Sequence, residues 1–316
     1  MVVGDSIGHN IKSENLVGLD NIINGSDIFI FNLEGVLVDS IDNIKACEGF
    51  PTHQSIFVSN SSFVNYLKKL APVTIANLAN NYIFDCSSEG VKETKRVLTE
   101  NSILSVGAGQ DLHEACEPLF IQDLGLAFVS YNFVIKDLVS ADTHHGGAAT
   151  LDACNHDYNS LKVEKGVDLI IASIHLGKWY ANIKKEQVEI IQNLFDSGAD
   201  IVIGHSPHIP QAIMATKDGR LAFFSLGNFI FRPDYRMPSL AHTTIVPKID
   251  LYTDGSRTDV TIYPVRIDND GIPHIIEEED RNSEIISRIA EDSKELNTFI
   301  NVTDNLGHIS VYQQYN

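Results

Sequence analysis

The stretch DIFIFNLEGVLV (residues 27–38) decides the fold class, because it is an almost uninterrupted apolar run whose polar side chains cluster in the middle. Such a run is typical of a strand that is covered on both faces of a sheet. The same pattern recurs in VTIANLA (73–79), LGLAFVSY (124–131), VDLIIASI (167–174), DIVI (200–203) and LAFFS (221–225). The sequence therefore predicts a sheet made of buried strands.

Helical patterns lie between these runs at 61–70, 89–101 and 184–197, with apolar residues spaced three or four positions apart. The last is the clearest, because Val188, Ile191 and Leu194 share one face and Gly198 follows its end. Strands that alternate with helices of this length indicate an α/β fold.

The pattern changes after about Thr243, where two strands flank an Asp254-Gly255 turn and predict an antiparallel hairpin. The tail 283–300 is expected to be a surface helix. Because no linker or repeat interrupts the chain, we predict a single domain over 1–316. Its α/β core would occupy 1–242, and the segment 243–316 would complete it.

The amino-acid composition excludes some classes of function. The 316 residues include 23 Lys and Arg against 42 Asp and Glu, which gives a formal net charge of −19. Such a balance argues against nucleic-acid binding, which needs clustered basic residues. The sequence contains no apolar run of the roughly 18 residues that a transmembrane helix requires.

Processing signals and cysteines bear on the cellular compartment. The start MVVGDSIGHN does not resemble a signal peptide, so we expect a cytoplasmic protein as the sequence stands. An extracytoplasmic or membrane-anchored protein remains the alternative if a preceding segment has been removed. The four cysteines are scattered without a CxxC pair, and we expect buried thiols rather than disulfides or a zinc site.

Polar side chains follow most of the predicted strands, and in α/β sheets such residues converge on one crevice. Carboxylate, amide and imidazole groups dominate the set, and these groups favour one or two divalent cations such as Mn, Zn or Fe. The set comprises Asp5, Asn32, Glu34, Asn80, Asn81, Asp85, His175, His205, His208 and Asn228.

Several of these residues have simpler explanations. Asp5 would also serve as a helix cap, and Asn80 and Asn81 as turn residues. A single His175 is equally typical of a hydrogen-bonded core histidine. Glu34 is harder to explain structurally, because an unpaired carboxylate is costly to bury. The GHSPH stretch (204–208), with two imidazoles three positions apart, is the most specific signal.

Taken together, these stretches resemble the CapA, or PgsA-like, family of capsule and poly-γ-glutamate biosynthesis proteins. The matching motifs occur in the family's order across nearly the whole chain. They are GDSIG (4–8), DIFIFNLEGVLVD (27–39), ANLANNYIFDCSSEGV (76–91), GAGQDLHEACEP (107–118), IHLGKWY (174–180), GADIVIGHSPH (198–208) and FFSLGNFIF (223–231).

The resemblance implies a four-layer α-β-β-α sandwich of the calcineurin-like metallophosphoesterase type. It also implies a metal centre in which Asp5 and His208 bind a first cation and Glu34 bridges to a second. Asn81, His175 and His205 would hold the second cation. Tyr82, Asp85 and His175 are the candidate catalytic residues. The residues implied around this centre or facing substrate are Asn32, Asn80, Lys178, Trp179, Ser206 and Asn228.

Three positions depart from the family's pattern. Tyr82 replaces a histidine that acts as proton donor, and a phenol is a poorer acid near neutral pH. Trp179 replaces a carboxylate beside Lys178, and Ser206 replaces an imidazole. Trp179 would either stack on a substrate ring or pack in the core.

The resemblance leaves two hypotheses. The first is a bacterial metal-dependent hydrolase or transferase that acts on a phosphoester or amide-type bond in capsule or poly-γ-glutamate-type polymer biosynthesis. The alternative is a non-catalytic accessory or binding protein of polymer assembly with a degenerate metal site. The partner would be an anionic or amide-containing small molecule or polymer.

Overall fold

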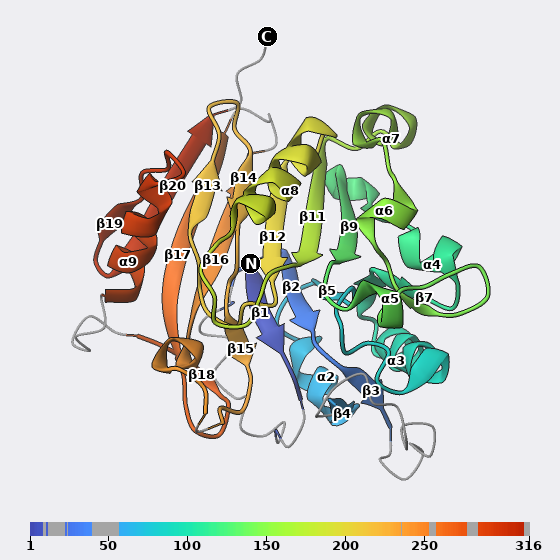
Figure 1. Ribbon diagram of the computed structural model, residues 1–316. Coiled ribbons are helices and arrows are strands. Elements are labelled where there is room, and N and C mark those ends of the chain that lie inside the picture. The colour runs from blue at the N-terminus through green and yellow to red at the C-terminus, as the bar shows by residue number, and fades with distance from the viewer. Residues whose placement is uncertain are drawn as a thin grey trace.

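A computed structural model describes residues 1–8, 11, 23, 25–39, 57–234, 236–252, 257–276 and 284–312. The predicted Asp254-Gly255 turn lies outside these residues. Three sheets form the body of the described chain (Figure 1).

The first sheet contains the strand that opens the chain and is parallel throughout. The order of its strands is β15 (Asn228–Ile230), β1 (Val2–Ser6), β2 (Ile28–Leu33), β5 (Val73–Asn77) and β6 (Leu104–Val106). The predicted strand 27–38 is broken after β2, because Gly35 has a φ of +139° and turns the chain into β3 (Val36–Val38). This break places Glu34 at the end of β2, between two buried strands.

The second sheet has a parallel centre and antiparallel edges. Its order is β13 (Ile213–Ala215), β14 (Leu221–Phe223), β12 (Ile201–His205), β11 (Leu169–His175), β9 (Leu126–Asn132) and β8 (Leu119–Ile121). Two small pairs, β3 with β4 (Val58–Asn60) and β7 (Ala108–Gly109) with β10 (Gly147–Ala148), lie beside the two large sheets.

The two sheets pack face to face, and each is covered by helices on its outer side. Ile30 of β2 and Ile171 of β11 share one hydrophobic cluster, which is the core between the sheets. The opposite face of the first sheet, with Phe29, packs on α2 (Ser62–Leu67) and α3 (Ser87–Glu100). The opposite face of the second sheet, with Ile170, packs on α7 (Tyr158–Lys165) and α8 (Lys185–Asp196). The predicted four-layer α-β-β-α sandwich is therefore confirmed.

The C-terminal segment adds a third, antiparallel sheet whose members lie together at the left of Figure 1. The predicted hairpin is present as β16 (Thr243–Leu251) and β17 (Arg257–Ile267). The predicted tail helix is shorter, α9 (Glu284–Lys294), and its Ile286 and Ile289 are buried. The pattern did not predict β18 (Pro273–Ile275), β19 (Asn301–Thr303) or β20 (Leu306–Tyr312).

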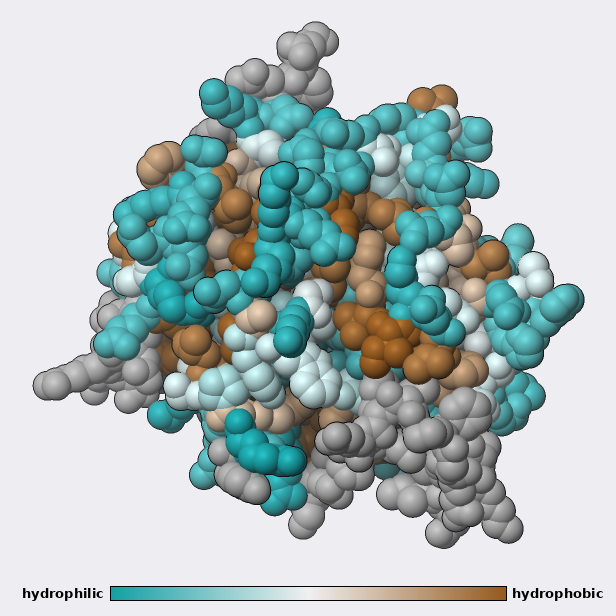
Figure 2. Space-filling model, in the orientation of Figure 1, coloured by the Kyte–Doolittle hydropathy of each residue, from teal (hydrophilic) through white to brown (hydrophobic). Residues whose placement is uncertain are grey.

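The remaining elements are short helices in the connections between strands. They are α4 (Leu112–Cys116), the 3-10 helix Gln122–Leu124, α5 (Lys136–Val139), α6 (Leu151–Cys154) and the 3-10 helix Ser239–His242. Among the described helices, none is long and apolar enough to span a membrane. The face seen in Figure 2 is mainly hydrophilic, as the net charge of −19 leads one to expect, with an apolar patch near its centre.

The expectation of buried thiols is wrong. Cys116 and Cys154 form a disulfide that joins the ends of α4 and α6. Cys86 is also disulfide-bonded, and no described cysteine is free. Spacing along the chain could not show this, because the two partners are 38 positions apart and meet only through packing of short helices.

Candidate metal centre

The carboxyl ends of strands from both large sheets meet at one place in the molecule. In the first sheet, Asp5 of β1 lies in register with Asn32 of β2. In the second sheet, His175 of β11 lies in register with His205 of β12. Glu34 follows directly after β2. The fold therefore collects side chains that are far apart in the sequence, as the strand-end pattern predicts.

Five of the six predicted ligands are in contact with one another. Asp5 Oδ2 is 3.2 Å from His208 Nδ1, and Asp5 Oδ1 is 3.4 Å from His205 Nδ1. Glu34 Oε1 is 3.6 Å from His175 Nε2 and 3.7 Å from His208 Nε2. All five residues are buried. The sixth, Asn81, is also buried, in the turn that follows β5.

The polar atoms of this cluster fit a divalent cation. Both carboxylate oxygens of Glu34 and both ring nitrogens of His205 are buried and make no hydrogen bond to any described residue. Such atoms are costly to bury unless something satisfies them. One ligand atom from each of Asp5, Glu34 and His208 lies within 4.8 Å of the other two. Oxygen and imidazole donors at this spacing suit Mn, Zn or Fe.

The pKa values show how the cluster distributes charge without a cation. Burial raises the pKa of Glu34 to about 8. Burial also opposes the charge of His208, but the carboxylates of Glu34 and Asp5 outweigh it and raise the pKa of His208 to about 9. Although burial disfavours its charge, the adjacent imidazoles of His205 and His208 hold the pKa of Asp5 well below its usual range. Protons thus occupy positions that a cation would take.

His208 presents Nε2 to the cluster because its other nitrogen is engaged. Asn228 Nδ2 donates to the carbonyl of Ala241 at 3.1 Å, so Asn228 Oδ1 faces the imidazole. His208 Nδ1 lies 2.8 Å from that oxygen and must therefore carry the proton. When the imidazole is neutral, Nε2 keeps its lone pair on the side of Glu34, as a metal ligand requires.

The GHSPH loop holds the candidate ligands His205 and His208 with an uncommon backbone conformation. Ser206 has a φ of +97° and His208 a φ of +58°, in a region that non-glycine residues seldom adopt. Ser206 N–H points at Asp5 Oδ2 from 3.4 Å, and Ser206 Oγ donates to the carbonyl of Gly177. Strain of this kind is concentrated at functional sites.

The candidate catalytic residues Tyr82 and Asp85 lie in the turn segment that follows β5. Tyr82 is buried with its ring centroid 4.4 Å from that of Phe57, and burial raises the pKa of its phenol. Asp85 is buried and accepts a hydrogen bond from Phe57 N–H at 2.9 Å. Asn80 donates to the carbonyl of Leu33 at 2.7 Å and so shapes the chain around Glu34.

The loop after β11 lies at the edge of the cluster. Trp179 is 50% exposed, and its ring meets that of His208 edge-on at a centroid distance of 5.9 Å. Trp179 therefore does not pack in the core, and this excludes one of the two roles predicted for it. Lys178 beside it is exposed. Phe231, which the sequence reasoning missed, is 5.4 Å from His208 and lies at the end of the FFSLGNFIF motif.

Asn77 is a second residue that the sequence reasoning missed. It is a fully buried amide that ends β5 and lies in register with Asn32. The signal was present, because Asn77 interrupts the apolar run VTIANLA as Glu34 interrupts its own.

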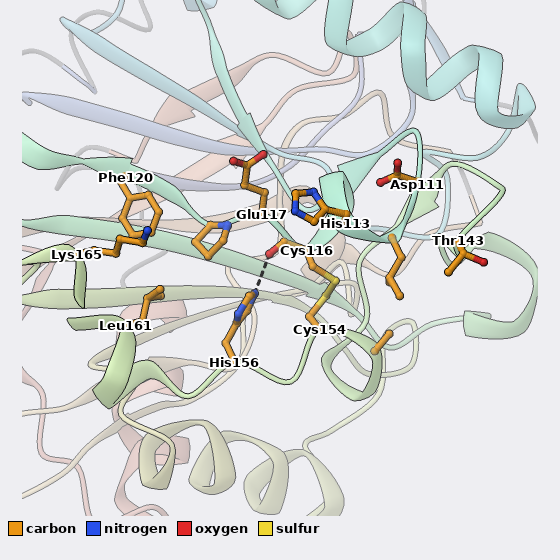
Figure 3. A pocket seen from close by; sticks show the side chains of 13 residues that line it. Asp111, His113, Cys116, Glu117, Phe120, Thr143, Cys154, His156, Leu161 and Lys165 are labelled. Atoms are coloured by element: carbon orange, nitrogen blue, oxygen red, sulfur yellow. Dashed lines mark hydrogen bonds between the residues drawn. A yellow bond between two sulfur atoms is a disulfide. The ribbon is translucent and has the colours of Figure 1, made fainter. Parts of the chain in front are cut away.

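A separate hollow of about 580 Å³ is lined by α4, α6 and neighbouring segments (Figure 3). It contains the Cys116–Cys154 disulfide, and His156 Nε2 lies 2.7 Å from the Cys116 carbonyl. None of the strand-end residues lines it. The hollow is therefore distinct from the candidate metal centre.

Comparison with known proteins gives relatives that are named for capsule and PGA biosynthesis. The capsule biosynthesis protein CapA of Bacillus anthracis is 29% identical over 171 residues, which cover 52% of this chain and 41% of that protein. The PGA biosynthesis protein CapA of Bacillus subtilis is 28% identical over 177 residues, which cover 55% and 46%. The matched part thus spans less than half the length of either relative.

Among solved structures, the 5'-nucleotidase from Candida albicans is 12% identical, with a TM-score of 0.45 over 90% of this chain and 52% of that one. The family model described as bacterial capsule synthesis protein PGA_cap matches residues 4–233, which include all six predicted ligands. The chain therefore belongs to the bacterial capsule synthesis protein (PGA_cap) family.

Proposed function

We propose that this protein is a metal-dependent hydrolase or transferase that acts on a phosphoester or amide-type bond during the synthesis of a capsule or polyglutamate-type polymer. The buried cluster of Asp5, Glu34 and His208, with both oxygens of Glu34 lacking a hydrogen bond among the described residues, carries this proposal. The family match supports the link to polymer synthesis.

The residues of the centre have separate tasks in this proposal. Asp5 and His208 would hold one cation, and Asn81, His175 and His205 would hold another, with Glu34 between them. When bound, a divalent cation supplies Lewis-acid polarisation of a substrate oxygen. Tyr82 keeps its proton at neutral pH because burial raises its pKa, so it would donate a hydrogen bond rather than transfer a proton.

The exposed residues at the edge of the centre suggest how substrate is held. Trp179 is the only tryptophan in the sequence, and it projects half-exposed beside His208. Lys178 adds a cation next to it. We expect Trp179 to contact an apolar or planar part of the substrate while Lys178 attracts an anionic part.

Metal analysis and activity on bis-p-nitrophenyl phosphate with Mn²⁺ test the proposal together. We expect near-stoichiometric metal in the unaltered protein and loss of both metal and activity in Glu34→Gln and His205→Ala. His156→Ala, which changes a histidine in the separate hollow, should leave both intact. Less than about 0.1 metal ion per chain after reconstitution with Mn²⁺ contradicts the metal centre.

The second candidate is an accessory or binding protein in which the centre holds a ligand without turning it over. The altered positions Tyr82, Trp179 and Ser206 favour it, and a relative in Mycobacterium tuberculosis is named a probable polyglutamine synthesis accessory protein. The net charge of −19 disfavours a polyanion unless metal intervenes. Stoichiometric Mn²⁺ without turnover of any phosphoester or amide substrate would support this candidate, and turnover would exclude it.

We also propose that the protein works in an oxidising compartment, which was the alternative to a cytoplasmic location. Cys86, Cys116 and Cys154 are all disulfide-bonded. Disulfides persist outside the cytosol and are rare within it. When cells that produce the protein are quenched with acid, none of the protein's cysteines should therefore react with a maleimide before reduction. A chain alkylated at Cys116 and Cys154 without reduction would place it in the cytosol.

A further inference from the structure

A chain of buried hydrogen bonds runs from the second sheet to Asp5 of the first. Ser130 Oγ of β9 donates to Asn77 Oδ1 of β5. Asn77 Nδ2 donates to Asn32 Oδ1 of β2 at 2.8 Å, and Asn32 Nδ2 donates to Asp5 Oδ1 of β1 at 2.8 Å. All four side chains are at most 2% exposed.

The direction of this chain is set by the backbone. The backbone N–H of Ala79 donates to Asn77 at 3.2 Å, and because an N–H cannot accept, the atom it meets must be Asn77 Oδ1. Asn77 therefore turns its amide nitrogen toward Asn32.

That orientation passes to the next amide. Asn32 must present Oδ1 to Asn77, so its nitrogen faces the Asp5 carboxylate. Asn80 Nδ2 points at the same Asn32 oxygen from 3.5 Å, and Asn80 is itself oriented by the backbone N–H of Tyr82 at 3.1 Å. Every hydrogen bond in the chain thus donates toward Asp5.

The direction of these hydrogen bonds affects the Asp5 carboxylate at the proposed metal centre. Buried hydrogen bonds that all donate in the same direction strengthen one another. This chain of hydrogen bonds favours an ionised Asp5 and fixes Asp5 Oδ1 in one orientation, while Asp5 Oδ2 stays on the side of His208. We propose that Asn77 and Ser130 are positioning residues that act through Asn32 to orient Asp5 as a metal ligand, an inference that rests on the proposed metal centre.

The neighbouring strand offers a matched control. Ser173 of β11 is in register with Ser130 of β9, and it is 6% exposed where Ser130 is 2% exposed. Its Oγ makes no hydrogen bond to any described residue. Ser130→Ala and Ser173→Ala remove the same atom from adjacent places, but only the first removes a member of the chain.

A third variant reverses the direction of the hydrogen bond between residues 77 and 32 without a change in side-chain size. Asn77→Asp puts an oxygen where the amide nitrogen met Asn32, so Asn32 must turn its nitrogen away from Asp5. We expect Asn77→Asp to weaken Mn²⁺ binding about 10–100-fold, as for other partners of metal ligands. Ser130→Ala should weaken it less, by about threefold, because Asn77 keeps the Ala79 hydrogen bond.

The measurements are calorimetric Mn²⁺ affinity and the visible absorption bands of the Co²⁺-loaded protein, which report ligand geometry. The Co²⁺ bands should shift in Asn77→Asp and stay unchanged in Ser173→Ala, and thermal unfolding verifies that each variant is folded. If the unaltered protein binds Mn²⁺ and Ser130→Ala binds it as tightly as Ser173→Ala, the inference is overturned and the metal centre stands. If the unaltered protein binds neither metal, both proposals are overturned.

Discussion

Glu34 and His208 make the stability of the metal-free protein depend on pH. The pKa of His208 is raised from 6.5 to about 9, and that of Glu34 from 4.5 to about 8. A group with a raised pKa in the folded state stabilises the fold below its unfolded pKa, and this contribution is lost as pH rises through the folded value. The chelator-treated protein should therefore lose stability between about pH 4.5 and 9, through Glu34 from about 4.5 to 8 and through His208 from about 6.5 to 9.

Thermal unfolding with EDTA and with Mn²⁺ across this window measures the effect. Mn²⁺ should raise the Tm more at pH 8.5 than at pH 6.5, because its ligands must be deprotonated. Glu34→Gln removes one of the two titrating groups and should flatten the pH dependence of the EDTA-treated protein. A Tm that rises with pH under EDTA would contradict the charge assignment.

At Trp179 we expect a change in function with little change in stability. The side chain is 50% exposed, so Trp179→Ala removes few core contacts and should shift the free energy of unfolding by no more than about 0.5 kcal/mol. If the ring holds substrate, KM should rise with a smaller change in kcat. Steady-state kinetics on an active substrate measure this, with Leu240→Ala as an exposed apolar control. An unchanged KM would remove Trp179 from the substrate site.

At the scale of elements, the position of Asp5 depends on how closely β1 approaches β15. A Cβ on Gly4 would lie 1.8 Å from the carbonyl oxygen of Gly227, which accepts the N–H of Asp5 at 3.0 Å. Gly4→Ala should therefore separate the strands and cost at least about 3 kcal/mol. Gly166→Ala is the control, because its φ is +63° but nothing lies within 4 Å, and it should cost about 1–2 kcal/mol. Urea denaturation compares them, and equal losses would contradict the steric explanation.

The elements themselves were predictable to different degrees. Runs that are apolar almost throughout, such as 167–174, became buried parallel strands, because burial on both faces leaves a purely local signature. Short edge strands such as β13 and β19 have only three residues each and carry no such signature. The buried face of α9 packs against β13 and the third sheet, and the predicted helix extended beyond its C-terminal end at Lys294.

At the scale of the whole molecule, the Cys116–Cys154 disulfide should stabilise the fold without serving the metal centre. It joins positions 38 residues apart, and replacing both cysteines with alanine should cost about 4 kcal/mol through the entropy of the unfolded chain. Because the hollow that contains this disulfide includes no strand-end residue, the Mn²⁺ affinity of the folded variant should not change. Urea denaturation and calorimetry measure the two quantities, and a weakened Mn²⁺ affinity would show that the two regions are coupled.

The sequence by itself determined the alternation of buried strands and helices and the donor chemistry at the strand ends, because burial and periodicity are local properties of the chain. Only the tertiary structure decided which of these donors meet. Ser206 N–H and Asp5 are 201 positions apart, and their approach depends on how the two sheets pack. The same packing brings Ser130 to Asn77. The packing of short helices joins Cys116 to Cys154, and the fold leaves Trp179 half-exposed. Such contacts arise from the three-dimensional arrangement of elements, which no local pattern encodes.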